Sequence, residues 1–234
     1  MKNILITGAG HGIGFSIAKH VQNISENLIL LTKPDNSLCH IKNNFPNAKN
    51  FGVNLLKEQD IIKVINIVKK NINHIDVIVN NAGFYVGKIF EKTKINELDD
   101  LYKIQMKAPF IIIQKLLPLL KLSECPQIIN ICSAANFARI PGESAYTAAK
   151  AGLSAFGDVL RSEFQRYNIR VTNIYPWTVN TKNFKNSENF LRPEDIGELV
   201  EFIINTHPKC QIMSIELSST NDWKGNWPPW ISLQ

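Results

Sequence analysis

The chain has 234 residues, of which 44% are hydrophobic and 20% charged, a composition typical of a globular protein. Its 26 Lys and Arg residues outnumber 20 acidic ones, but they are scattered along the chain, which argues against a nucleic-acid partner. No apolar run of about 18 residues predicts a membrane span, no secretory signal stands at the start, and the four cysteines lack metal-binding spacing. We therefore expect a cytoplasmic protein with no membrane partner and no metal site.

Apolar strands alternate with amphipathic helices along the whole chain. In chain order, strands are predicted at 4–7, 28–31, 51–53, 76–79, 128–132, 170–175 and 211–217. Helices are predicted at 13–25, 59–70, 96–120, 144–167 and 193–205. The polar segment 34–47 is expected to be a loop with at most a short helix. Pro109 and Pro118 are expected to kink the long helix at 96–120 or to end it early, because proline has no amide hydrogen to donate.

This alternation predicts the α/β class, with a parallel sheet covered by helices on both faces. We expect a single Rossmann-type, doubly wound domain over residues 1–217. Residues 218–234 are expected to form a tail of the same domain that contains Trp and Pro.

A glycine-rich loop joins the first predicted strand to the first predicted helix. It reads Thr7-Gly8-Ala9-Gly10-His11-Gly12-Ile13-Gly14. Glycines let the main chain approach a pyrophosphate closely, and the helix that follows directs free amide groups at the anion. Because this loop follows a strand and opens a helix, it predicts a dinucleotide-binding site.

The end of the second predicted strand indicates which dinucleotide binds. An acidic residue at this place accepts from the ribose hydroxyls of NAD, whereas a basic residue accommodates the 2′-phosphate of NADP. The chain has Lys33 there, and no carboxylate occurs before Asp35. Lys33, assisted by His11, favours NADP(H), with NAD(H) as the alternative. The plainer interpretation of Lys33 is a solvated surface charge.

Tyr146 and Lys150 are four residues apart on a predicted helix and therefore share a face. We expect the ammonium of Lys150 to lower the pKa of Tyr146, so that the phenol acts as a general acid or base near neutral pH. Ser133 ends the fifth predicted strand and faces the same crevice as the glycine loop, where its hydroxyl can hold a substrate oxygen. The plainer interpretations are a packed tyrosine beside a solvated lysine, and a serine that caps its own backbone.

Together these motifs resemble the short-chain dehydrogenase/reductase family over about residues 2–217. The resemblance rests on the glycine loop, on Asn80-Asn81-Ala82-Gly83, on Ser133 with Tyr146 and Lys150, and on Pro176 through Thr181. It implies a seven-stranded parallel sheet and an oxidoreductase that transfers a hydride between a nicotinamide cofactor and a carbonyl or secondary alcohol. It also implies a homodimer or homotetramer. Besides the glycine loop and Lys33, the cofactor contacts that it implies are Asn54, Leu55, Asn81, Ala82, Gly83, Tyr146, Lys150, Pro176, Val179 and Thr181.

Three positions depart from the pattern of that family. Gln105 stands where the family has an asparagine that completes a catalytic tetrad and anchors a proton-relay water. Trp177 follows Pro176 where glycine is usual, and Asn54 replaces an aspartate near the adenine. Gln105 keeps an amide and is retained as the fourth catalytic residue. The departures also keep open an NADP(H)-binding regulatory or structural protein with little catalysis, or a related lyase or epimerase.

Aromatic and apolar residues are predicted to line the substrate pocket, which suits an apolar or aromatic carbonyl or alcohol. The predicted lining is Phe84, Tyr85, Ala135, Phe137 and Trp177, with Phe184 or Phe190 as further candidates. The short segment from Lys182 to Arg192 is expected to form a small lid. The tail has three further tryptophans, Trp223, Trp227 and Trp230, which are expected to pack on a neighbouring subunit, on a pocket or on their own domain.

Overall fold

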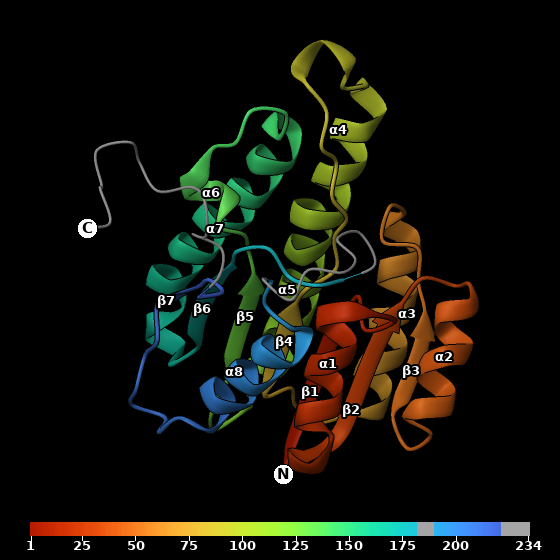
Figure 1. Ribbon diagram of the computed structural model, residues 1–234. Helices are drawn as coiled ribbons and strands as arrows, with labels where there is room; N and C mark the ends of the chain where they lie inside the picture. The colour runs from red at the N-terminus through yellow and green to blue at the C-terminus, as the bar shows by residue number, and fades with distance from the viewer. Residues whose placement is uncertain (182–189, 221–234) are drawn as a thin grey trace.

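A computed structural model describes residues 1–181 and 190–220 of the chain. Seven parallel strands form one sheet at its centre, in the order β3-β2-β1-β4-β5-β6-β7 (Figure 1). Helices cover both faces of this sheet. The structure therefore confirms the predicted α/β class, with a Rossmann-type, doubly wound arrangement.

The strands and helices alternate as the sequence predicts. The strands are β1 (Lys2–Thr7), β2 (Ser25–Thr32), β3 (Lys49–Gly52), β4 (Val77–Asn80), β5 (Gln127–Ile131), β6 (Arg170–Pro176) and β7 (Ser214–Leu217). The helices are α1 (Gly12–Val21), α2 (Asn36–Asn44), α3 (Glu58–Asn71), α4 (Ile95–Tyr102), α5 (Ala108–Leu120), α6 (Ala135–Ala138), α7 (Ser144–Phe164) and α8 (Pro193–Asn205).

Two apolar clusters hold the helices against the sheet, one on each face. Neighbouring residues of a strand point to opposite faces, so that Leu5 joins the cluster beneath α3 and α5. Ile4 and Ile6 join the cluster beneath α1 and α8. Because both faces are buried, the inner strands contain apolar runs, although β5 and β6 also bury polar side chains.

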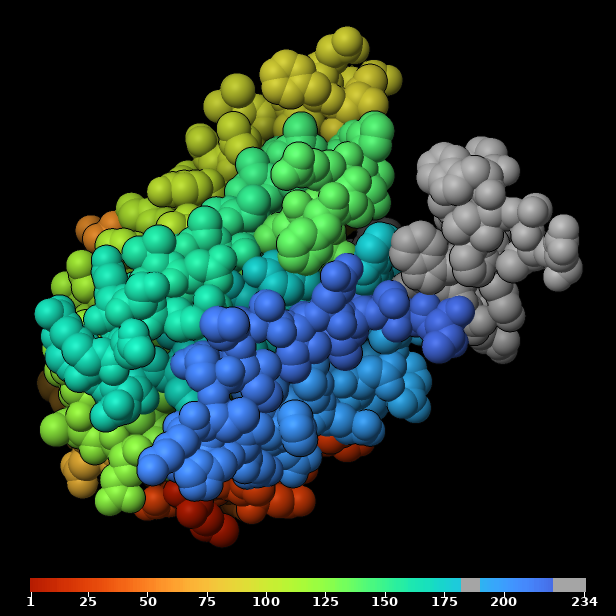
Figure 2. All heavy atoms as spheres, turned by 90° about the vertical axis from the view of Figure 1, so that its left-hand side faces the viewer, coloured from red at the N-terminus to blue at the C-terminus, as the bar shows by residue number. Residues whose placement is uncertain are grey.

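The sheet ends at β7, which is an edge strand. Figure 2 shows the molecule from this side, with α8 and β7 in blue beside α7 in teal. The exposed side chains Phe202 and Met213 belong to this region. Across the described residues, no helix has both the length and the apolar composition that a membrane crossing requires.

Several boundaries differ from those expected. The helix predicted at 13–25 ends at Val21, because the hydroxyl of Ser25 donates to the Val21 carbonyl at 2.6 Å and the chain already enters β2. The segment 34–47 contains the short helix α2, whose first turn is capped by Asp35 through a 2.8 Å bond from the Ser37 amide. The last strand begins at Ser214 rather than at 211.

The long helix predicted at 96–120 is interrupted before its first proline rather than by it. A π-turn over Lys103–Lys107 separates α4 from α5, and the Ala108 amide donates to the carbonyl of Lys103, five residues back. Pro109 then falls in the first turn of α5, where its missing amide hydrogen costs little. Pro118 lies inside α5, which ends two residues later at Leu120.

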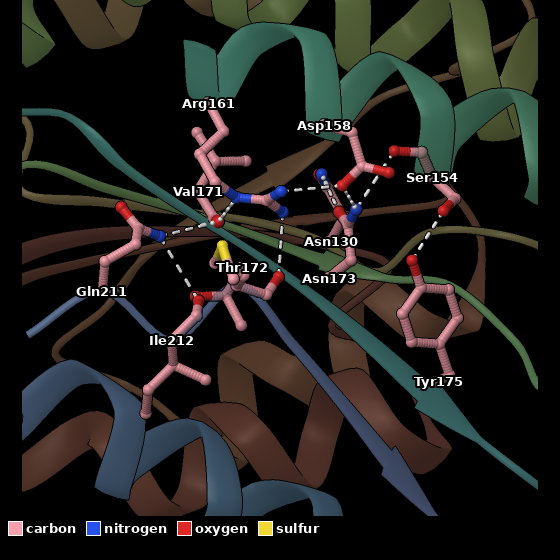
Figure 3. A network of polar contacts seen from close by, with 11 residues as sticks. Asn130, Ser154, Asp158, Arg161, Val171, Thr172, Asn173, Tyr175, Gln211 and Ile212 are labelled. Atoms are coloured by element: carbon pink, nitrogen blue, oxygen red, sulfur yellow. Dashed lines mark hydrogen bonds and ion pairs between the residues drawn. The ribbon is translucent and has the colours of Figure 1, made fainter. Parts of the chain in front are cut away.

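A chain of buried amides connects the middle of the sheet to α7 (Figure 3). Asn80 donates to Asn130 at 2.8 Å, and Asn130 donates to Asn173 at 2.9 Å. Asn173 in turn donates at 3.0 Å to the carbonyl of Ser154 and at 3.0 Å to the carboxylate of Asp158, both on α7. Since α7 also carries Tyr146 and Lys150, this network fixes the helix on which the candidate site depends.

Two glycines of α7 provide a test of this packing. A Cβ atom on Gly157 would lie 2.4 Å from Asn173 Oδ1 and 2.6 Å from Asn130 Nδ2. Gly157→Ala should therefore lower the free energy of unfolding by about 1–3 kcal/mol, because the amides must move apart. On Gly152 the nearest atom would be Met106 Sδ at 3.9 Å, so Gly152→Ala should be neutral or stabilise by up to about 1 kcal/mol. Urea denaturation of both variants measures the difference, and equal effects would contradict the assigned clash.

Candidate functional site

The carboxyl ends of β1, β4, β5 and β6 open into one cavity of about 440 Å³. Its walls come from the loops that follow these four strands, together with the first turns of α1 and α7. In an open parallel sheet this edge is where ligands bind, because the loops there diverge.

The glycine loop forms one wall, through Gly8, His11, Gly12, Ile13 and Gly14. Gly8 and Gly12 have φ angles of +70° and +55°, which side chains disfavour. A Cβ atom on Gly14 would lie 2.3 Å from the carbonyl oxygen of Gly8. Glycine is therefore required at position 14 for α1 to approach the Gly8 carbonyl, and it is favoured at positions 8 and 12 by their backbone angles.

The start of α1 suits an anionic ligand. Its N-cap residue, His11, makes no capping bond with its side chain, and no acidic residue lies in its first turn. The first amide groups of the helix are thus left for an acceptor from outside the chain. Together with the glycine wall, this is the arrangement that the pyrophosphate of a dinucleotide requires.

Thr7 fastens the glycine loop to the loop after β4. Its hydroxyl oxygen accepts from the amides of Asn81 and Ala82, each at 3.0 Å. The Asn81 side chain donates to the Thr7 carbonyl at 2.9 Å and to the Gly8 carbonyl at 3.2 Å. Thr7 is not among the described residues that line the cavity, whereas Asn81, Ala82 and Gly83 are. Its place in the structure is therefore beneath the loops, where it holds two of the walls together.

Ser133, Tyr146 and Lys150 lie together in the wall opposite the glycine loop. The Ser133 hydroxyl is close enough to Tyr146 to lower the pKa of its phenol. Lys150 is buried and donates to the carbonyl of Ile131 at 2.7 Å, with its Nζ 6.0 Å from the centre of the Tyr146 ring. The structure thus brings together three residues that the sequence predicted as catalytic.

Burial governs the protonation of this group. It raises the pKa of Tyr146, an effect that the hydrogen bond from Ser133 opposes and the charge of Glu143 reinforces. Burial also lowers the pKa of Lys150 to about 8. The expectation that Lys150 lowers the pKa of Tyr146 therefore differs from what the structure shows. The physical reason is that desolvation outweighs the charge of an ammonium that points at the Ile131 carbonyl rather than at the phenol.

Gln105 occupies the π-turn and is fully buried. Its Nε2 donates to the carbonyl of Phe84 at 2.8 Å, and this bond holds the loop that follows β4 in place. Its Oε1 has no hydrogen-bond partner among the described residues. A buried acceptor of this kind is a position where an ordered water binds. Its catalytic role stays a prediction, because Gln105 is not among the described residues that line the cavity.

The residues predicted to bind the adenosine end lie outside the main cavity. Lys33 is exposed at the end of β2. A Cβ atom on Gly10 would lie 2.4 Å from Thr32 Oγ1, so Gly10 packs against the end of β2 rather than lining the cavity. Asn54 closes its own turn, because its Oδ1 accepts from the Leu56 amide at 3.0 Å. Leu55 packs on the apolar core and lines a separate, smaller hollow next to α5.

Asp35 is a neighbour of Lys33 that the sequence reasoning did not use. Its pKa is lowered by hydrogen bonds from Ser37 and by the charges of Lys33 and His11. The Ser37 hydroxyl lies 3.3 Å from His11 Nδ1. The carboxylate of Asp35 thus lies near Lys33 and His11, beside the glycine loop. The sequence analysis predicted cofactor contacts only for Lys33 and His11.

Four of the five residues predicted for the substrate pocket line the cavity, namely Phe84, Tyr85, Ala135 and Trp177. Phe137 instead packs on Tyr175, with ring centres 4.8 Å apart, and is largely exposed. Pro176, Val179 and Thr181, which were predicted to contact the cofactor, also line the cavity.

Other predicted pocket residues lie away from this lining or outside the described part of the chain. Phe190 lies next to Leu191, which pairs with Val179 across an isolated bridge. Phe184, most of the predicted lid and the three tail tryptophans fall outside the described residues.

The sequence reasoning missed Ile140 and Glu143, which line the cavity from the loop before α7. Glu143 stands three residues before Tyr146 and immediately before α7. This spacing was the available sequence signal that Glu143 lies near Tyr146, because residues three positions apart at the start of a helix are separated by about one turn.

Comparison with known proteins agrees with this geometry. A family model described as short chain dehydrogenase matches residues 2–191. The fatty acyl-CoA reductase of Acinetobacter baylyi is 28% identical over 220 residues, which cover 89% of this chain and 74% of that protein.

Solved structures show the same fold. The 3-ketoacyl-(acyl-carrier-protein) reductase of Brucella melitensis, complexed with NADH, has a TM-score of 0.86 at 20% identity and covers 94% of this chain and 98% of its own. The alcohol dehydrogenase of the archaeon Thermococcus sibiricus, complexed with 5-hydroxy-NADP, has a TM-score of 0.85 at 21% identity and covers 94% and 97%. At these identities the two structures establish the likeness of fold.

The buried ammonium of Lys150 predicts a dependence of stability on pH. Its pKa is about 8 in the folded chain and 10.5 for an ordinary solvated lysine, so between these two values the unfolded chain binds more protons. The free energy of unfolding should therefore rise with pH across this window. Relative to Lys150→Met, the wild-type chain should gain about 1–2 kcal/mol between pH 8 and pH 9.5. Urea denaturation at both pH values measures this gain, and a constant difference between the two proteins would refute the shift.

Proposed function

Because the chain belongs to the short-chain dehydrogenase family, we propose that it is an oxidoreductase that transfers a hydride between NADP(H) and a carbonyl or secondary-alcohol substrate. One observation carries this proposal. Ser133, Tyr146 and Lys150 line the same cavity as the glycine loop.

In the proposed reaction, a bound nicotinamide ring supplies or accepts the hydride. The Ser133 hydroxyl holds the substrate oxygen, and the Tyr146 phenol gives a proton to this oxygen as the carbon is reduced. The raised pKa of Tyr146 favours its protonated form, so the phenol is ready to donate in the reductive direction. In the oxidative direction Tyr146 must first lose that proton, which becomes easier as the pH rises.

Lys150 and Gln105 support Tyr146 in this proposal. With a pKa of about 8, Lys150 exchanges protons near neutral pH and can restore the proton of Tyr146 through an intervening hydroxyl or water. The unpartnered Oε1 of Gln105 offers an acceptor for such a water. The alternative of a cofactor-binding protein with little catalysis differs from this proposal in predicting binding without turnover.

The choice of NADP(H) rests on the charges beside the glycine loop. Lys33 and His11 favour a 2′-phosphate, whereas Asp35 opposes it and can accept from the ribose hydroxyls of NAD(H). We favour NADP(H) because Lys33 stands at the end of β2, where a basic residue accommodates the 2′-phosphate. NAD(H) is the alternative, and its dependence on Asp35 makes the two cofactors separable by mutation.

The proposed substrate is a small carbonyl compound or alcohol with an apolar or aromatic body, since Phe84, Tyr85 and Trp177 line the cavity. We further propose a homodimer or homotetramer. The exposed side chains Phe110 on α5 and Val159 on α7 support this assembly, because such surfaces are commonly buried between subunits. A cytoplasmic location stays part of the proposal.

The role of Tyr146 has a direct test. Tyr146→Phe removes the proton donor but keeps the ring, so kcat for ketone reduction should fall by about 100-fold or more. Binding of NADPH, followed by its fluorescence, should change little. The matched control is Tyr102→Phe, at an exposed tyrosine of α4, which should keep full activity. Undiminished turnover in Tyr146→Phe would contradict the assignment.

The choice of cofactor is tested at Lys33. Lys33→Ala should weaken NADPH binding about 10- to 100-fold and NADH binding much less, since one charge-assisted contact is lost. Lys42→Ala on α2 removes the same charge from an exposed site and serves as control. Fluorescence titrations of all three proteins give the dissociation constants. An equal loss for both cofactors would show that Lys33 does not recognise the phosphate.

A further inference from the structure

Glu143 is the one acidic residue among the described residues that line the cavity. It lies immediately before α7, in the loop that approaches Tyr146. Its charge is close enough to raise the pKa of both Tyr85 and Tyr146. A carboxylate therefore faces the space in which the reacting part of a substrate must lie.

Tyr85 fixes the position of this carboxylate. Its hydroxyl donates to Glu143 Oε1 at 2.8 Å, and its ring packs edge-on against the ring of Tyr146, with centres 5.1 Å apart. The pKa of Tyr85 is raised to about 12, so its hydroxyl stays a donor at ordinary pH. Gly87 makes room for this contact, because a Cβ atom there would lie 2.6 Å from the Tyr85 hydroxyl.

The charge of Glu143 is not neutralised by the described part of the chain. No Lys, Arg or His side chain there comes within ion-pair distance of it. Its side chain accepts from the Tyr85 hydroxyl, a neutral donor, at Oε1. A half-buried carboxylate held in this way is stabilised when a donor, above all a cation, comes from the ligand.

We propose that Glu143 is a specificity residue that accepts a hydrogen bond from a protonated amine on the substrate. The site then selects carbonyl or alcohol substrates with a cationic amine a few bonds from the reacting carbon, and it disfavours those with a carboxylate in the same place. This inference rests on the proposed function for the identity of the reacting group. It narrows the expected substrate from a purely apolar molecule to one with an apolar body and a cationic end.

A purely structural role for Glu143 makes a different prediction. If the carboxylate served only to hold Tyr85, its charge would not affect which ligands bind. Glutamine can accept the same hydrogen bond from Tyr85, so Glu143→Gln keeps that contact and removes the charge. The control is Glu163→Gln, on the exposed side of α7, which changes the net charge of the chain equally but lies far along the helix.

Binding without turnover gives the cleanest measurement. Calorimetric titration of the purified full chain at pH 7, with and without saturating NADPH, compares cyclohexylamine, cyclohexanol and cyclohexanecarboxylate, which share one ring. The wild-type chain and Glu163→Gln should bind the amine about tenfold or more tightly than the carboxylate. In Glu143→Gln this preference should fall about tenfold, with the alcohol affected least.

Two results would overturn the proposal: equal binding of amine and carboxylate to the wild-type chain, or an unchanged preference in Glu143→Gln. If Glu143→Gln does not fold, Glu143→Ala replaces it. Glu143→Ala also removes the charge, so the amine preference should fall about tenfold, and an unchanged preference would overturn the proposal. Because these ligands do not react, failure of the proposed function would appear separately, as absent reduction of the 4-amino and 4-carboxy derivatives of cyclohexanone.

Discussion

Asn130 and Asn173 hydrogen-bond to each other at 2.9 Å in the middle of the sheet, between its two apolar clusters. Both are fully buried, so leaving either amide unpaired would cost stability. Asn173 accepts that bond at Oδ1 and donates from its Nδ2 group to α7, at the Ser154 carbonyl and the Asp158 carboxylate. The angle and height of α7 over β5 and β6 are therefore set by polar groups, which tolerate less sliding than apolar contacts do. Lys150 adds another such contact, from its ammonium to the Ile131 carbonyl.

Burial against the sheet also shifts the pKa values of the two candidate catalytic residues in the first turns of α7. Tyr146 and Lys150 are both pushed towards their neutral forms, the phenol by a raised pKa and the ammonium by a lowered one. The Ser133 hydroxyl is the described group that most favours the ionised phenol. With a pKa of about 8, Lys150 is still mostly charged at pH 7, and the negative charge at this end of the cavity is supplied by Glu143, which Tyr85 holds beside Tyr146.

The sequence predicted the sheet well because buried parallel strands are apolar throughout, and a local pattern is enough to find them. It also located the glycine loop, Ser133, Tyr146 and Lys150, whose signals are short spacings next to predicted elements. It could not locate the π-turn at Lys103–Lys107, because no local spacing marks a turn that is defined by the bond from the Ala108 amide to the Lys103 carbonyl. Nor could it give the direction of the pKa shift of Tyr146, which depends on burial and on where the Lys150 ammonium points. Glu143 was missed for a similar reason, since its importance comes from Tyr85, which is distant in the sequence.

The π-turn also determines how α4 faces its neighbours. One residue of an α-helix corresponds to a rotation of about 100°, so the extra residue of a π-turn offsets the faces of the two flanking helices by that angle. With this offset, Leu101 of α4 packs against Ala145 and Ala149, on either side of the catalytic candidate Tyr146. Loss of a single residue between 103 and 107 would turn Leu101 away from α7 without changing any of the described residues that line the cavity. A deletion in this helical segment, which does not line the cavity, would therefore remove the packing support that Leu101 gives to the helix turn carrying Tyr146.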